Sequence, residues 1–365
     1  MNKLGLKIID IYIIKKYISS FGFTILLFAL VAMVIDFSEK ADAYQREALT
    51  VKEVFFTYYT AFVPHISVML FPMYALITVI FFTSRMASNS EIISIFNAGV
   101  SFWRFSRPYL IAAGIMAITH FILINFIVPN GNKRRVIFEG KYIDKASDKG
   151  KTDNVHLFLN ENTKVFIGSY RKHDSTARDF RIESFENGQL KSILKAETAD
   201  WQDYPNRWRL TNAQKREFDG MKERITNYGL TLDTAVNVQP EDFVRYNNHN
   251  EMLTTPELWR EIKKLESRGA GNTKSFKIEI NRRTAEPVTI IIVTMIGMTL
   301  AARKERGGMG LNLAIGVALG AIFVFLSRFS VTFANQPNMS AFLGVWFPNL
   351  IFSIIALFLM SKAQK

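Results

Sequence analysis

Long apolar runs constrain this chain more than any other feature of its sequence. The chain has 365 residues, 49% of them hydrophobic, and several runs approach or exceed the length of a membrane span without an acidic or basic residue other than histidine. About 20 such residues in a helix cross the roughly 30 Å of hydrocarbon in a bilayer. We therefore predict six membrane-spanning helices, at residues 18–36, 57–82, 104–128, 285–302, 311–333 and 341–361.

The first of these runs could be mistaken for a secretory signal. Lysines precede it, but no small-residue cleavage pattern follows it, so we predict an uncleaved first span. Residues 4–14 are also apolar and flanked by lysines, which favours a helix lying in the cytoplasmic interface of the membrane.

A polar block separates the third and fourth runs. It contains short segments of alternating or β-branched character with turn signals between them, and Asn187-Gly188 is the strongest hairpin signal. Such a pattern is typical of a β-sandwich or jelly roll. After it, Thr255 and Pro256 begin a predicted helix that Gly269 ends.

These segments predict an α-helical membrane protein with six transmembrane helices and an all-β domain, a sandwich or jelly roll, between the third and fourth. We divide the chain into an N-terminal membrane half (1–128, with a short helix at 88–99), a β domain (129–250), a helical connector (251–284) and a C-terminal membrane half (285–365).

Lysine and arginine in the short segments predict the orientation of the chain. One side of the membrane receives twelve of them and three acidic residues, whereas the short loops on the other side are acidic or uncharged. Since short basic loops stay in the cytoplasm, both termini are predicted to be cytoplasmic and the large polar domain extracytoplasmic.

Motifs of catalysis are missing from the sequence. It contains no Walker-type phosphate loop, no His-Glu-x-x-His and no Gly-x-Ser-x-Gly, its five histidines lack metal-ligand spacing, and it has no cysteine. The stretch "GGMG" beside Arg303, Lys304 and Arg306 fits a flexible basic turn better than a nucleotide site. We expect no metal or cofactor in this chain, and no ATP hydrolysis by it.

The loop "SRMASNSEIISIFNAGVSFWRF" between the second and third spans contains a short apolar helix. Ser88 and Glu91 have capping-box spacing, and Gly99 is a predicted stop. The apolar residues could pack under the adjacent spans. Alternatively, the helix docks in a groove of a soluble partner. The candidate docking residues are Arg85, Ser88, Glu91, Ile92, Ile95, Phe96 and Asn97.

Polar groups within or beside the predicted spans lie at similar depth, towards the outer leaflet. Charged and polar side chains in hydrocarbon are costly and are often functional. Snorkelling and hydrogen bonds between helices would explain each of them singly. A wet cavity for an anionic amphiphile would explain them together, with arginines binding phosphate. The candidates are Asp36, Lys40, His65, His120, Arg282, Arg283, Arg328 and Asn349.

Taken along its whole length, the sequence resembles the lipopolysaccharide-export permeases LptF/LptG (YjgP/YjgQ). The resemblance is carried by "IIDIYIIKKYISSFGFTILLFALVAMVIDFSEK", "SRMASNSEIISIFNAGVS", "TKVFIG", the Trp-x-Leu of "RWRLTN" and "MLTTPELWREIKKLESRG…KIEINRRTAEPV". It implies a permease of an ABC transporter in the bacterial inner membrane. The partners it implies are a paralogous permease, a dimer of the ATPase LptB, which binds ATP and magnesium, and the periplasmic protein LptC.

The resemblance also implies roles for particular residues. Residues 88–101 correspond to the coupling helix, with Glu91 at its acidic position, and residues 36–40 to the mouth of a lipid cavity. That mouth can be basic in the family, whereas here Asp36 and Glu39 are acidic beside Lys40. Arg282, Arg283 and Arg328 are therefore better candidates for the lipid phosphates, or a divalent ion bridges them.

Two other functions remain open on the residues alone. A membrane sensor would use the β domain to bind a ligand, but its cytoplasmic segments would be unusually short. An intramembrane enzyme acting on lipids would need converging nucleophiles or metal ligands, for which His65, His120 and Asp36 are the available residues.

Overall fold

A computed structural model describes most of the chain, namely residues 7–143, 153–160, 162–171, 174–203, 207–220, 222–236, 238, 249–267, 273–302, 308–336 and 338–363. The chain divides into two compact units. One is helical and comprises Met1–Phe138, Glu251–Thr255 and Lys274–Lys365, and the other, Glu139–Asn250 with Pro256–Thr273, contains the β-strands.

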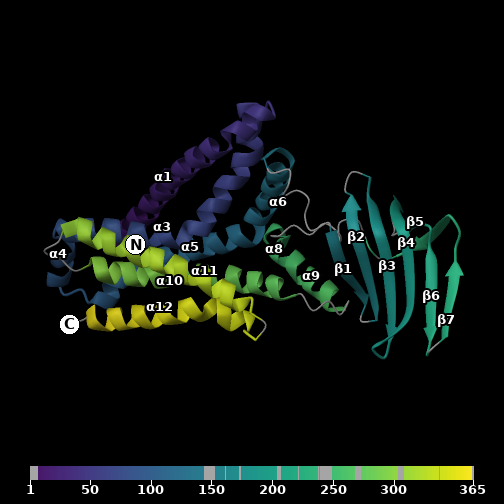
Figure 1. The fold of residues 1–365 in the computed structure, drawn as a ribbon. Coiled ribbons are helices and arrows are strands. Elements are labelled where there is room, and N and C mark those ends of the chain that lie inside the picture. Colours follow the sequence, from purple (N-terminus) through teal and green to yellow (C-terminus); the bar gives the residue numbers. More distant parts are fainter. Residues whose placement is uncertain are drawn as a thin grey trace. The chain divides into compact units, whose positions relative to one another are not determined.

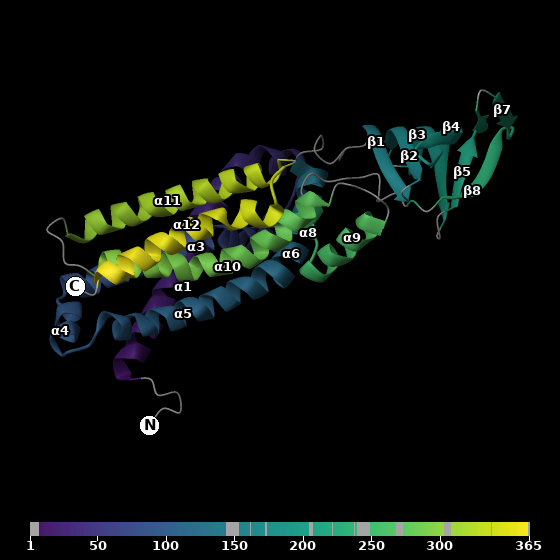
Figure 2. The same cartoon turned by 90° about the horizontal axis from the view of Figure 1, so that it is seen from below.

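Long helices build the first unit (Figures 1 and 2). Within the described residues, five helical stretches are long and apolar enough to cross a membrane. In α11, the described apolar part, Ala318–Ala334, is shorter. The principal helices are α1 (Ile8–Arg46), α3 (Thr60–Ser88), α5 (Phe102–Ile122), α10 (Lys274–Ala301), α11 (Gly308–Ala334) and α12 (Ala341–Ala363).

Short helical elements connect the long ones. The helix α2 (Val51–Glu53) and the π-helical turn η1 (Val54–Tyr59) precede α3, and α4 (Glu91–Asn97) lies between α3 and α5. Beyond α5 the chain stays helical through η2 (Leu123–Ile127), α6 (Val128–Phe138) and η3 (Glu139–Ile143). The predicted domain boundary at residue 128 therefore falls inside a helical stretch.

Aromatic side chains fill the core where α1, α3, α5 and α10 meet. Tyr17 of α1, Phe82 of α3 and Tyr109 of α5 are buried, and the Phe82 and Tyr109 rings stack with their centroids 5.4 Å apart. The Tyr17 hydroxyl donates to the Ala75 carbonyl oxygen (3.2 Å) and lies 2.8 Å from the Thr294 hydroxyl. These bonds satisfy a polar group that would otherwise be costly among apolar side chains.

Antiparallel strands build the second unit. They are β1 (Asp153–Asn160), β2 (Thr163–Arg171), β3 (Thr176–Glu186), β4 (Gln189–Asp203), β5 (Arg207–Thr211), β6 (Gln214–Asp219), β7 (Lys222–Asn227) and β8 (Thr231–Ala235). The main path runs β1-β2-β3-β4-β5-β8. The long strand β4 pairs with β6 through residues 192–195 and with β5 through residues 198–203. The sheet therefore branches at β4, which has two different neighbouring strands along its length.

The predicted hairpin between β3 and β4 is present. Asn187 (φ 50°) and Gly188 (φ 77°) both have positive φ, as a two-residue type I′ turn requires. Glu186 pairs with Gln189 directly beside the turn. One face of the sheet is covered by buried apolar residues, including Val165, Ile167, Phe180 and Trp208.

The segment expected to lie in the membrane interface and the first predicted span form one continuous helix from Ile8, with residues 4–6 outside the described part of the chain. One expectation about local structure was wrong. The capping box of Ser88 and Glu91 does not form, because Ser88 is still in the last turn of α3. Ser90 precedes α4 instead, in the left-handed conformation (φ 63°) and without a side-chain cap.

Other helix boundaries agree with their local signals. Gly99 ends α4 with φ 79°, and its backbone N–H donates to the Phe96 carbonyl (2.9 Å). Two further helices, α8 (His249–Met252) and α9 (Thr255–Ser267), precede α10. The predicted stop of α9, Gly269, lies outside the described residues, as do Arg303, Lys304 and Arg306.

Candidate functional site

The short helix α4 lies at one end of the helical unit, the end at which the C-terminus is also found (Figures 1 and 2). Its apolar side packs inward: Ile92 is 1% exposed, and the Phe96 ring lies 5.3 Å from that of Phe105. Ile93 is 42% exposed on the opposite side. Of the predicted docking residues, Arg85, Ser88 and Asn97 are also exposed, Glu91, Ile95 and Phe96 are half-buried, and Ile92 is not accessible to a partner.

Glu91 is positioned by contacts from two directions. Its Oε2 accepts a hydrogen bond from the Tyr12 hydroxyl of α1 (3.1 Å), and its Oε1 accepts one from the Asn89 side chain (3.3 Å). Lys16 in turn donates to the Tyr12 hydroxyl (2.8 Å). The carboxylate is therefore held at the surface beside the start of α1.

A second polar cluster lies towards the other end of α1. The Asp36 carboxylate is almost fully buried and accepts hydrogen bonds from the hydroxyls of Tyr58 (3.1 Å) and Tyr59 (3.2 Å) and from the Lys40 ammonium (2.5 Å). Lys40 also bonds the Tyr58 hydroxyl and lies 4.5 Å from the centre of its ring. The predicted cavity mouth is thus an internally paired cluster in which the charge of Lys40 is already balanced by Asp36.

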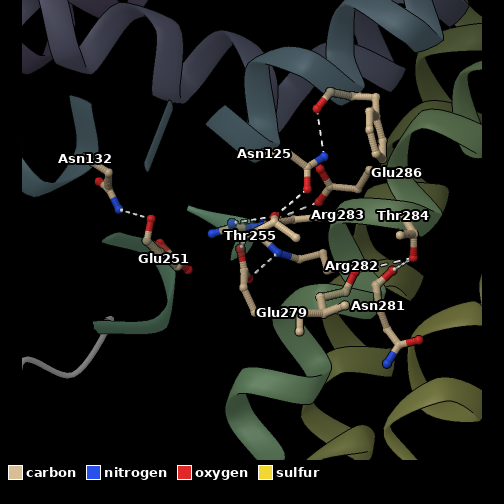
Figure 3. Close-up of polar contacts among 12 residues, drawn as sticks. Asn125, Asn132, Glu251, Thr255, Glu279, Asn281, Arg282, Arg283, Thr284 and Glu286 are labelled. Carbon is tan, nitrogen blue, oxygen red and sulfur yellow. Dashed lines mark hydrogen bonds and ion pairs between the residues drawn. The ribbon is translucent and has the colours of Figure 1, made fainter. Parts of the chain in front are cut away.

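The largest polar network surrounds the first half of α10 (Figure 3). Glu279 accepts from Arg282 (2.9 and 3.0 Å) and from Arg283 (2.8 Å). Arg282 also lies 3.4 Å from Glu286. Two carboxylates therefore face two guanidinium groups, and both arginines are neutralised within the helix that carries them.

Figure 3 shows this network continuing to other helices. Arg283, of which 1% of the side chain is exposed, donates through Nη1 to the Thr255 hydroxyl (3.1 Å). Thr255 donates to the Asn125 side-chain oxygen (2.5 Å), and Asn125 donates to the Phe121 carbonyl (2.7 Å). The first residue of α9 is thereby tied to α10 and to η2.

The remaining candidate residues lie partly around the same network. His120 is fully buried; its Nε2 lies 3.2 Å from the Val68 carbonyl oxygen and 3.6 Å from Glu286 Oε2. Asn349 accepts from Thr289 (2.7 Å) and donates to the Ala285 carbonyl (2.9 Å). Arg328 is exposed on α11, and His65 is half-buried in the second turn of α3.

The acidic partners of Arg282 and Arg283 were not predicted from the sequence. Glu279 and Glu286 stand three or four residues from Arg282 and Arg283, the spacing at which helical side chains meet, so charge spacing could have revealed them. No local signal could have found Tyr58, Tyr59 or Tyr12, because their partners lie 22, 23 and 79 residues away along the chain. Within the described residues, no three His, Asp or Glu side chains gather in a way that could hold a metal ion.

Comparison with models of protein families identifies the family of this chain. Residues 11–362 match the family model described as lipopolysaccharide export system permease LptF/LptG. The chain belongs to this family. The match spans both membrane halves and the β domain, so the whole architecture and no isolated motif carries it. Comparison with the curated proteins gave no match.

Membership of LptF/LptG confirms the resemblance seen in the sequence. It makes the chain a permease component of lipopolysaccharide export, a transporter subunit whose own role is not enzymatic. The apolar helices and the family together indicate a multi-pass protein of the inner membrane that works as one of a pair of permeases.

Proposed function

We propose that this chain is one half of a permease pair that extracts lipopolysaccharide from the outer leaflet of the inner membrane and delivers it to a periplasmic bridge of jelly rolls. Six spans, with α11 as the fifth, would cross the membrane, and the β unit would complete a jelly roll on the periplasmic side. A separate cytoplasmic ATPase, the LptB dimer, would bind ATP and magnesium and supply the energy, and LptC would associate with the periplasmic side.

The observation that carries the proposal is α4, in the setting of the family match over residues 11–362. A seven-residue helix with one buried side chain is a weak structural element, yet it presents Ile93 and Asn97 to solvent and holds Glu91 in a defined position. An exposed surface that combines apolar, polar and acidic side chains suits docking to a soluble partner. We infer that Glu91, Ile93 and Asn97, with Arg85 and Ser88, form the surface on which the ATPase docks.

A charge reversal tests this docking surface. Glu91→Lys should reduce the amount of ATPase that co-purifies with the permease pair by roughly tenfold, about 1.4 kcal/mol. Glu39→Lys, the same change at an exposed site on α1 far along the helix, is the matched control and should leave co-purification unchanged. Equal recovery of ATPase with both variants would refute docking at α4.

Among the basic candidates, Arg328 is the most accessible contact for the lipid phosphates. It is exposed, whereas Arg283 is buried and bonded to Glu279 and Thr255. Arg282 keeps 20% of its side chain exposed, so it can reach a phosphate from the edge of the network. We infer that Arg328 and Arg282 bind the lipid, while Asp36, Lys40, His65, His120 and Arg283 shape the helices around it.

A lipid-binding measurement separates these roles. Arg328→Gln should weaken photo-crosslinking of lipopolysaccharide to the permease pair several-fold, because it removes an exposed donor to phosphate. Arg209→Gln, at an exposed arginine on β5, provides the control and should not change crosslinking. Unchanged crosslinking in Arg328→Gln would contradict the assignment.

A further inference from the structure

Helix α1 contacts other elements near its two ends, and most of its middle part is exposed. Its early part is buried on one side, through Asp10, Ile13, Tyr17 and Phe21 at intervals of three or four residues. Beyond Phe21 the buried residues become sparse. The middle of the helix instead exposes apolar side chains, at Phe23, Leu26, Leu27, Leu30, Val31, Val34 and Ile35.

An ion pair between α1 and α5 holds the early part of α1 in place. The Arg104 guanidinium donates to both oxygens of the Asp10 carboxylate, at 2.7 and 2.6 Å, and the Lys7 backbone N–H donates to it at 2.8 Å. Only 3% of the Asp10 side chain is exposed. A bidentate, desolvated pair of this kind fixes geometry as well as charge.

The same end of α1 is joined to the docking helix. Tyr12, two residues after Asp10, donates to Glu91 of α4 (3.1 Å). Arg104 is the third residue of α5, and Ser101, which caps α5 through the Arg104 backbone N–H (3.3 Å), follows α4 closely. Helix α4 buries only Ile92, and besides its packing against α3 it is positioned by the Tyr12–Glu91 hydrogen bond to α1 and by the Phe96–Phe105 ring contact with α5.

The other end of α1 carries the cluster of Asp36, Lys40, Tyr58 and Tyr59. At 1.5 Å per residue, Tyr12 and Asp36 are separated by about 36 Å along the helix axis. No proline interrupts α1, whereas α3, α5, α10 and α12 each contain at least one. Since proline is the commonest cause of a kink, the proline-free α1 is suited to transmit a displacement from end to end.

We propose that α1 moves as one body with the docking helix and transmits its displacement to the Asp36 cluster. Asp10, Arg104 and Tyr12 are then positioning residues that couple the ATPase to the lipid path. The inference rests on the proposed docking of an ATPase at α4, and it adds to that function the route by which the movement crosses the membrane.

Uncoupling variants test the proposal in the reconstituted complex of the permease pair with its ATPase. Arg104→Gln should leave ATPase co-purification and ATP hydrolysis near the wild-type values, but lower the lipopolysaccharide released per ATP several-fold. Arg107→Gln, at an exposed arginine three residues further along α5, is the matched control and should not change this ratio. Asp10→Arg combined with Arg104→Asp should restore it. A variant that merely folded poorly would lower hydrolysis and release together.

Distances between spin labels provide a second readout, and the absence of cysteine from the chain makes labelling simple. Labels at Lys15 and Ser94, which are exposed and lie outside the docking surface, should keep their separation when the ATPase is trapped with vanadate, because α1 and α4 move together. Labels at Glu39 on α1 and Thr332 on α11 should change their separation in the wild type but not in Arg104→Gln.

The possible outcomes distinguish the two proposals. An unchanged ratio of lipid to ATP in Arg104→Gln, or a changed Lys15–Ser94 distance on trapping, would overturn transmission through α1 while leaving docking at α4 intact. Failure of the wild-type pair to bind any ATPase would overturn the docking function and this inference with it.

Discussion

Arg283 Nε donates to Glu279 Oε1 at 2.8 Å, and 1% and 4% of the two side chains are exposed. Glu279 also accepts from Arg282, so one buried carboxylate balances part of the charge of two guanidinium groups. Arg283 extends the pair to Thr255. Of the arginines that the sequence offered as phosphate ligands, Arg283 thus serves first to hold α10 to Thr255 at the beginning of α9.

Removing the Glu279 charge should destabilise the helical unit strongly. Glu279→Gln leaves two arginines facing Glu286 as the remaining carboxylate of the network, and breaking a buried pair in this way costs about 3–5 kcal/mol. We expect a lower melting temperature in detergent, measured by tryptophan fluorescence. Glu39→Gln, at an exposed site, should leave the melting temperature unchanged; equal melting temperatures for the two variants would show that the network adds no stability.

Gly297 lies where α10 approaches α3 too closely for a side chain. A Cβ at this position would be 2.5 Å from Val79 Cγ1 and 2.9 Å from Leu76 Cδ1, so Gly297→Ala should push the helices apart. We expect a loss of about 1–3 kcal/mol, as for other overpacked cores, measured by thermal unfolding.

Gly114 supplies the matched control for that substitution. It also lies within a helix, α5, but a Cβ there would meet nothing within 4 Å. Gly114→Ala should therefore be neutral or stabilise the protein by up to about 1 kcal/mol. If Gly297→Ala melted at the wild-type temperature, the close approach of α3 and α10 would be wrong.

The stability of the turn between β3 and β4 should depend on which residue replaces Gly188. Its φ of 77° lies in the left-handed region, where a residue with a Cβ costs about 1–2 kcal/mol. Gly188→Val should lower the temperature at which the β unit loses its near-ultraviolet signal in the full chain. Asn tolerates this conformation, so Gly188→Asn should be close to neutral, and equal losses in both variants would contradict the type I′ turn.

Trp208 anchors the core of the β unit. It is fully buried, and its indole N–H donates to the Val238 carbonyl at 2.9 Å. Trp208→Ala should cost about 3–5 kcal/mol by leaving a large cavity. Trp259, which is 52% exposed on α9, gives the comparison: Trp259→Ala should change the denaturation midpoint little. A similar midpoint for both variants would rule out Trp208 as the anchor.

Much of the fold could be predicted because its signals are local. The apolar runs, the hairpin at Asn187-Gly188 and the stop at Gly99 each depend on a few neighbouring residues and on the intrinsic backbone preferences of those residues. The capping box failed for a local reason too: Ser88 has the right spacing, but α3 extends through it. Spacing alone does not say which of two adjoining helices a residue joins.

By itself, the sequence determined that this chain has apolar helices flanking a β domain, that it contains no cysteine, and that it resembles the LptF/LptG permeases. Tertiary structure alone decided which charges far apart in the sequence are paired. The Asp10–Arg104 pair joins residues 94 positions apart, and the Asp36 carboxylate meets two tyrosines from another helical segment. Tertiary packing also buries the Ile92 side chain, because an apolar helix face is buried where a neighbouring helix packs against it. Helical periodicity shows that such a face exists, but only packing decides what covers it.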